Sequence, residues 1–165
     1  MPPTTARDYA AIRSALPATA PAHRAVAMQL AVDVLWSHLA RTGVSWIGFY
    51  LKSAGADEMV LGPRRDKPAC SPIGLHGACG RCWRERVPLV VRDVASLGAG
   101  YIACDPRDRS EVVLPLLEAD GSCWGVLDAD SYDAGSFDER DANELGEVMR
   151  ALGLSAHDAG PAVVI

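Results

Sequence analysis

The sequence has no long apolar run and no basic excess, and each absence excludes a class of protein. No segment of the 165 residues reaches the ~18 consecutive apolar residues that a membrane-spanning helix needs. Residues 1–8 lack the basic start and apolar stretch of a secretory signal peptide. The net charge of −5 argues against a general nucleic-acid-binding protein, because such domains are normally basic. We therefore expect a cytoplasmic protein with neither a membrane nor a nucleic-acid partner.

Cysteine is present, but in a number that does not suit a closed set of disulfides. The chain has five cysteines, and the cytoplasm keeps thiols reduced. Cysteines in that compartment are more often catalytic, redox-active or metal-binding than structural, although any single one can simply pack as a small apolar residue. A chain of this length with 49% hydrophobic residues can fold without disulfides as one domain.

The hydrophobic pattern predicts an α+β domain at about residues 1–154, in which helices flank a central antiparallel sheet. Apolar residues at helical spacing lead up to Gly43, which is a good helix stop. The expected elements are N-terminal helices within about 5–41, strands at 44–51 and 59–61, a loop at 62–80, a short helix at 79–86, a strand at 88–92, an irregular stretch at 93–108, strands at 111–117 and 122–128, and a helix at 137–152. A connection as short as residues 118–121 cannot make a parallel crossover, which favours the antiparallel arrangement.

The C-terminal end of this expected domain core, residues 44–152, is marked by a helix signal. Ser136 and Glu139 have the spacing of a capping box, in which each side chain satisfies the other's free backbone amide. Residues 155–165 are expected to form a flexible tail.

Three acidic residues are expected near one another on two neighbouring strands. Because alternate side chains of a strand share a face, Asp128 and Asp130 lie on the same face, and Glu111 joins them if the two strands pair as a hairpin. Such acids repel each other unless a proton or cation lies between them, and a substrate ammonium would be a suitable cation. Spacing alone favours a simpler interpretation, in which Asp128 and Asp130 cap the turn into Ser131.

The same alternation places Trp124 on the face of these acids and Cys123 on the opposite face, where Cys123 is expected to be a core residue. Trp46 and Tyr50 share a face of the strand at 44–51. They could wall a small pocket, although an aromatic stripe on a strand is usually part of the core.

Three cysteines lie in the two irregular stretches, Cys70 and Cys79 in one and Cys104 in the other. A thiolate that is oxidised to a sulfenic acid condenses with a second thiol to form a disulfide, and two loops whose cysteines approach each other suit such a cycle. Asp105 would raise the thiol pKa of Cys104, whereas the arginines that follow would oppose this effect. Together with the acids, these thiols indicate redox chemistry on a small zwitterionic substrate.

Cys79 and Cys82 form a Cys-x-x-Cys pair, which has two other interpretations. A thioredoxin-like redox pair belongs in a βαβ unit, which the expected element order lacks. Half of a zinc site is the other possibility, but no second half has a common zinc spacing. Thiol redox chemistry is therefore favoured over both.

Eight short segments in the same order, across about residues 25–152, resemble the GAF-domain free methionine-(R)-sulfoxide reductases. They are WIGFYL at 46–51, LGP at 61–63, KPAC at 67–70, ACG at 78–80, DV at 93–94, IACD at 102–105, SEVVLP at 110–115 and GVLDADS at 125–131. A GAF domain in general shares the fold with that family but not the three cysteines together with the acids.

This resemblance implies a GAF fold with a sheet of about six antiparallel strands, a homodimer, and a redox role for each of the three cysteines. Cys104 would attack the sulfoxide sulfur and become a sulfenic acid, releasing free methionine. Cys70 would resolve it as a disulfide, and Cys79 would be a second relay. Thioredoxin would restore the thiols as an external reductant, with electrons from NADPH. The protein itself would bind no cofactor and no metal.

The resemblance also implies the substrate-binding residues. Glu111, Asp128 and Asp130 would hold the substrate ammonium and help to protonate the sulfoxide oxygen, which replaces the turn-capping interpretation. Trp46 and Tyr50 would line the pocket for the substrate side chain.

The chain departs from the family's pattern at four places beside the site. The loop at 74–78 is one residue shorter, Tyr101 stands where histidine is usual, Cys82 is additional, and the stretch between Cys79 and Cys104 is one residue longer. These changes bear on efficiency and specificity more than on the chemistry. Two alternative functions are a non-catalytic GAF module that binds a small ligand, and a thiol redox sensor in which the Cys70–Cys104 disulfide is itself the signal.

Overall fold

The computed structural model describes residues 6–101 and 104–165. Residues 1–5 of the expected domain, and Ile102 and Ala103 of the IACD segment, lie outside the described residues. The elements are α1 (Tyr9–Ala15), α2 (Arg24–Leu39), η1 (Ala40–Thr42), β1 (Val44–Leu51), β2 (Glu58–Arg65), β3 (Ile73–Gly74), α3 (Ala78–Glu85), β4 (Leu89–Val91), η2 (Val94–Gly100), β5 (Ser110–Leu117), β6 (Cys123–Ser131), α4 (Glu139–Ala151) and β7 (Val163–Val164).

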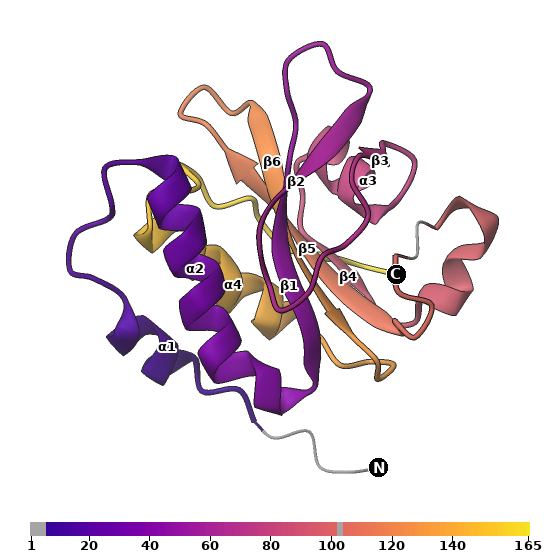
Figure 1. Ribbon diagram of the computed structural model, residues 1–165, viewed down its shortest axis with the longest axis horizontal. Coiled ribbons are helices and arrows are strands. Elements are labelled where there is room, and N and C mark those ends of the chain that lie inside the picture. Colours follow the sequence, from indigo (N-terminus) through magenta and orange to yellow (C-terminus); the bar gives the residue numbers. More distant parts are fainter. Residues whose placement is uncertain (1–5, 102–103) are drawn as a thin grey trace.

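The strands form one sheet in the order β3-β2-β1-β6-β5-β4-β7 (Figure 1). Every neighbouring pair is antiparallel except β4 and β7, which run parallel. The predicted α+β class is confirmed, and the sheet is mixed because β7 adds a seventh strand. None of the described helices is both long and apolar enough to cross a membrane.

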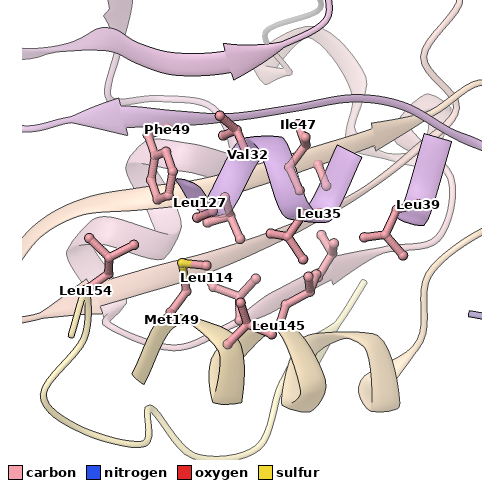
Figure 2. Packing of buried hydrophobic residues seen from close by; sticks show 14 of the residues in the cluster. Val32, Leu35, Leu39, Ile47, Phe49, Leu114, Leu127, Leu145, Met149 and Leu154 are labelled. Carbon is pink, nitrogen blue, oxygen red and sulfur yellow. The ribbon is translucent and has the colours of Figure 1, made fainter. Parts of the chain in front are cut away.

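The two faces of the sheet bury different sets of side chains. Helices α1, α2 and α4 cover one face with the main apolar core. Figure 2 shows Val32, Leu35 and Leu39 of α2 directed into the same core as Leu145 and Met149 of α4. Helix α3 packs on the other face over a smaller cluster that includes Trp46, Tyr50 and Cys79. The candidate site lies on this second face.

The helix stop at Gly43 is confirmed, and its cause is local. Gly43 has a φ of 95° after the short helix η1, a conformation that glycine adopts without steric cost. The chain then enters β1, whose bounds match the predicted strand at 44–51.

The predicted capping box at Ser136 and Glu139 is wrong. Asp138 and Asp141 form the box, and α4 begins at Glu139. The Ser136 hydroxyl instead accepts a hydrogen bond from Arg7, whose guanidinium also pairs with Asp141 at 2.7 Å. The local box of Asp138 and Asp141 therefore caps the helix, and Ser136 is left to bind Arg7 of the N-terminal segment.

The prediction of a flexible tail after residue 155 is also wrong. Val163 and Ile165 donate backbone hydrogen bonds to Pro88 and Val90, and Arg92 donates to the carbonyl of Ile165. These bonds satisfy the outer backbone groups of β4, which would otherwise be an exposed sheet edge.

Two further differences come from strand irregularities. Strand β2 runs to Arg65 rather than ending at 61, because its second half pairs with β1. Pro63 is tolerated there since β3 pairs only with Glu58 and Met59, which leaves Pro63 with a neighbouring strand on one side.

Trp124 does not share the face of Asp128. The β5–β6 register shifts between Leu116 and Leu117, and the Trp124 ring packs against the main core with its Nε1 donating to the Leu154 carbonyl at 3.1 Å. A bulge of this kind reverses the alternation of side chains.

Candidate active site

Three carboxylates meet on the second face of the sheet. Glu111 on β5 is paired in register with Asp130 on β6, and Asp128 lies two residues before Asp130. One carboxylate oxygen from each lies within 4.8 Å of the others. The side chains of Glu111 and Asp128 are buried, with 4% and 6% of their surface exposed, which is not the environment of acids that cap an exposed turn.

Burial dominates the electrostatics of these acids. It raises the pKa of Glu111 to about 8, with a further contribution from Asp130. Burial likewise raises the pKa values of Asp128 and Asp130 well above the carboxyl range, and the neighbouring acids add to the effect. Within residues 6–101 and 104–165, no lysine, arginine or histidine forms an ion pair with them. The cluster therefore carries protons at neutral pH or attracts an external cation.

Trp46 and Tyr50 wall the site and also hold the segment that carries Cys70. Their ring centroids are 6.1 Å apart. Trp46 Nε1 donates to the carbonyl of Lys67 at 2.9 Å, and the Tyr50 hydroxyl donates to the carbonyl of Cys70 at 2.8 Å. Each aromatic ring thus has an apolar face toward the site and a polar atom that fixes the adjoining loop.

The two loop cysteines are joined. Cys70 and Cys104 form a disulfide with their Cα atoms 5.5 Å apart, and both residues are exposed. Cys79, near the start of α3, is a free and buried thiol that donates to Asp128 Oδ2 at 3.5 Å. Burial raises the pKa of Cys79, and the charges of Asp128 and Glu111 raise it further, so this thiol stays protonated.

The two other cysteines lie away from the carboxylates. Cys82 is buried in α3, and Cys123 is half-buried at the start of β6, where its thiol donates to the Gly125 carbonyl at 3.1 Å. Across the part of the chain that the structure describes, the acid trio is the one group of three or more potential ligands that converges well enough for a metal, so the zinc interpretation of the Cys-x-x-Cys pair gains no support.

The charge of Asp105 beside Cys104 is compensated. Its carboxylate pairs with Arg107 at 2.8 Å and Lys67 at 2.7 Å, and accepts a hydrogen bond from Tyr132 at 2.9 Å. The hydrogen bonds from Arg107 and Lys67 hold the pKa of Asp105 well below its usual value. Its negative charge therefore opposes thiolate formation at Cys104 less than the sequence alone implied.

A small cavity of ≈ 40 Å³ connects these groups. Its lining residues are Trp46, Tyr50, Ala69, Ile73, Ala78, Cys79, Tyr101, Cys104, Asp108, Glu111, Asp128 and Asp130. A wider hollow of ≈ 280 Å³ shares Trp46, Cys104, Asp108 and Asp130 with it and reaches Lys67 and Arg107. The structure thus brings seven of the eight predicted site residues to one cavity, and the eighth, Cys70, is bonded to Cys104.

Two further polar residues line this cavity. Asp108 is 8% exposed, and burial together with the charge of Asp105 raises its pKa to about 6. Burial strongly raises the pKa of Tyr101, and the charge of Glu111 adds to this. Sequence reasoning treated Tyr101 only as a departure from a family pattern and did not select Asp108, because both residues lie in an irregular stretch where no periodicity assigns side chains to a face.

Comparison with known proteins identifies the family. The family described as GAF domain matches residues 22–155. The free methionine-R-sulfoxide reductase of Neisseria meningitidis, whose X-ray structure contains its substrate, is 36% identical to this chain. The match covers 87% of this chain and 80% of that one, with a TM-score of 0.72. The chain belongs to the GAF-domain free methionine-R-sulfoxide reductase family.

Two other members of this family have the same relationship to the chain. The fRMsr of Staphylococcus aureus in its reduced form is 30% identical with a TM-score of 0.81, and the match covers 92% of this chain and 97% of that one. The free methionine-R-sulfoxide reductase of Escherichia coli is 38% identical over 113 residues, which are 67% of this chain and 66% of that protein. Matches to the curated relatives span between 63% and 72% of the relatives' own length.

The raised pKa of Glu111 predicts a pH-dependent stability. The folded chain keeps this proton up to about pH 8, whereas the ordinary carboxyl value is 4.5. The folded state therefore binds more protons between these values, and stability is lost as the pH rises through them. Because each pKa unit is worth about 1.4 kcal/mol, we expect the melting temperature to fall by several degrees between pH 5 and 9, and to fall less in Glu111→Gln.

The measurement is thermal unfolding followed by circular dichroism at several pH values. Glu58→Gln is the matched control, since Glu58 is an exposed acid, and this variant should follow the wild-type curve. Identical pH profiles for Glu111→Gln and the wild type would show that Glu111 does not hold its proton in the folded state.

Proposed function

We propose that this protein reduces free methionine-(R)-sulfoxide to methionine. The observation that carries the proposal is that a redox-capable cysteine, Cys104, lines the same cavity as three carboxylates that form no ion pair with a cation among the described residues. A zwitterionic amino acid brings the missing ammonium, and its sulfoxide brings an electrophilic sulfur. The relatives from Neisseria meningitidis and Escherichia coli are free methionine-R-sulfoxide reductases, which supports the assignment.

In the proposed reaction the Cys104 thiolate attacks the sulfoxide sulfur, and the sulfoxide oxygen takes a proton from the carboxyl cluster. The oxygen passes to Cys104 as a sulfenic acid, and methionine leaves. The Cys70 thiol then attacks the sulfur of that sulfenic acid, water leaves, and the Cys70–Cys104 disulfide forms. Two thiols are oxidised for each sulfoxide that is reduced. A carboxyl such as Glu111, with a pKa of about 8, is protonated at neutral pH and can supply the proton.

Glu111, Asp128 and Asp130 hold the substrate ammonium in this proposal, and Trp46 and Tyr50 contact its side chain. Cys79 is a second relay thiol that can exchange with the disulfide. Because Cys70 and Cys104 are exposed, an external dithiol protein such as thioredoxin can reach their disulfide and restore both thiols with electrons from NADPH. We also propose that the enzyme acts as a cytoplasmic homodimer without a bound cofactor.

The proposal predicts a narrow substrate range in a thioredoxin-coupled assay of NADPH consumption. Free methionine-(R)-sulfoxide should be turned over. The (S) epimer should not be turned over, because the positions of the oxygen and the lone pair on its sulfur are the reverse of those in the (R) epimer. A peptide-internal methionine sulfoxide should also fail, since it has no ammonium for the acid trio.

The substrates separate the alternatives. Equal turnover of free and peptide-internal sulfoxide would contradict recognition of the ammonium. If the reduced, folded wild type turns over no sulfoxide, the enzyme is excluded. Formation of the Cys70–Cys104 disulfide with a general oxidant would then favour a redox sensor, and its absence would favour a ligand-binding GAF module.

A further inference from the structure

No cation of residues 6–101 or 104–165 forms an ion pair with the acid trio. Glu111 Oε1 and Asp128 Oδ1 are buried and have no hydrogen-bond donor within the same part of the chain. A buried polar atom without a partner is destabilising, and more so when the group is charged. The side chains of Glu111 and Asp128 are more than nine-tenths buried and both line the cavity. Apart from a proton that the Glu111 and Asp128 carboxyl groups share, these two oxygens have no partner among the described residues, and a bound cation would supply one.

The dimensions of the site select a small ligand. The carboxylate oxygens lie within 4.8 Å of one another, and ligands on one Mn²⁺, Mg²⁺ or Ca²⁺ ion, each about 2.0–2.6 Å from the metal, are at most about 4–5 Å apart. The cavity of ≈ 40 Å³ has room for an ion with about one water, whose share of liquid volume is about 30 Å³. With Cys70 and Cys104 joined, it is too small for a whole amino acid.

The chemistry of the donors selects the kind of cation. Three carboxylates on two adjacent strands form an all-oxygen set, which hard divalent cations prefer. The nearest sulfur, Cys79, remains a thiol and donates to Asp128, so it is not a competing ligand in this state. Rigid strand backbones fix the three carboxylates, so little ordering is needed on binding.

We propose that Glu111, Asp128 and Asp130 form a binding site for a divalent cation of the oxygen-preferring class, which binds both the reduced and the disulfide form and excludes the substrate ammonium. The site coincides with the ammonium site of the proposed function, so the cation is a competitive inhibitor of that reaction. Cation binding itself requires no turnover and stands as a separate property of the chain.

Mn²⁺ is the probe, because its electron paramagnetic resonance signal distinguishes free from bound ion. The disulfide form of the protein, first freed of metal with a chelator, is titrated with Mn²⁺. We expect one saturable site per chain, at least tenfold weaker binding in Asp128→Asn and in Glu111→Gln, and unchanged binding in Glu58→Gln. Circular dichroism checks that each variant is folded.

Absence of saturable binding, or an affinity in the two trio variants equal to that of the wild type, would overturn the proposal. In the turnover assay we expect Mn²⁺ to raise KM for methionine-(R)-sulfoxide without lowering kcat, and a fall in kcat alone would contradict competition for the ammonium site. The two failures are distinguishable: Mn²⁺ binding without sulfoxide turnover removes the proposed function only, and turnover without Mn²⁺ binding removes the cation site only.

Discussion

Replacement of Cys104 by serine should abolish methionine formation, with a loss of at least about 10³-fold, because a serine hydroxyl is a far weaker nucleophile than a thiolate. Cys104 lines the cavity beside the acid trio, and no other exposed thiol does so within the described residues, since Cys79 is buried and holds its proton. The measurement is a single-turnover reaction of pre-reduced protein with excess methionine-(R)-sulfoxide, in which methionine is quantified by chromatography.

Two matched cysteine variants separate attack from resolution. Cys123→Ser should form methionine at the wild-type rate, because Cys123 is not among the residues that line the cavity. Cys70→Ser should still form about one methionine per chain in a single turnover but should slow under thioredoxin recycling, since the sulfenic acid lacks its resolving thiol. Methionine formation by Cys104→Ser at more than about a tenth of the wild-type rate would assign the attack to another cysteine.

Asp128→Asn should lower kcat/KM for methionine-(R)-sulfoxide by about 10²-fold or more. Truncation of one partner in a buried, hydrogen-bonded charge pair costs about 2–5 kcal/mol, and Asp128 is buried at the centre of the trio, between Glu111 and the thiol of Cys79. The folded protein should nevertheless keep or gain thermal stability, because the change removes an unpaired buried acid.

A sulfoxide without an amine provides the internal control for this prediction. Such a compound should be a poor substrate of the wild type. The further loss of its turnover in Asp128→Asn should be smaller than the loss for methionine-(R)-sulfoxide. Initial rates with both compounds, together with the melting temperature, test the claim. Equal losses for the two substrates would mean that Asp128 acts on the sulfoxide chemistry or on the fold rather than on the ammonium.

The elements whose signals are local could be predicted from the sequence. Strand β1 has the predicted bounds, and the hairpin of β5 and β6 was located by a short turn between two apolar segments. Gly43 stops the first long helix through its own backbone conformation. In each case the decisive residues are near neighbours in the chain, so pattern and propensity are sufficient.

The predictions that failed depended on distant contacts. The C-terminal residues pair with β4, and no local feature of that short segment reveals which strand edge is free. Arg7 binds Ser136 across the domain, so that side chain is not the helix cap, and Asp138 and Asp141 form the capping box instead. A register shift between Leu116 and Leu117 turned Trp124 to the other face. Such a bulge cannot be predicted from the alternation of polar and apolar residues, because the bulge itself breaks that alternation.

By itself the sequence determined the chemistry that is available: thiols in two loops, and acids spaced to share one face of a strand. The tertiary structure alone decided that Cys104, Tyr101 and Asp108 reach the same cavity as those acids, and that the nearby cations Lys67 and Arg107 pair with Asp105 rather than with the trio. The reason is physical. Side-chain alternation fixes which residues share a face within one strand, but burial, charge compensation and cavity size arise only when segments far apart in the chain pack together.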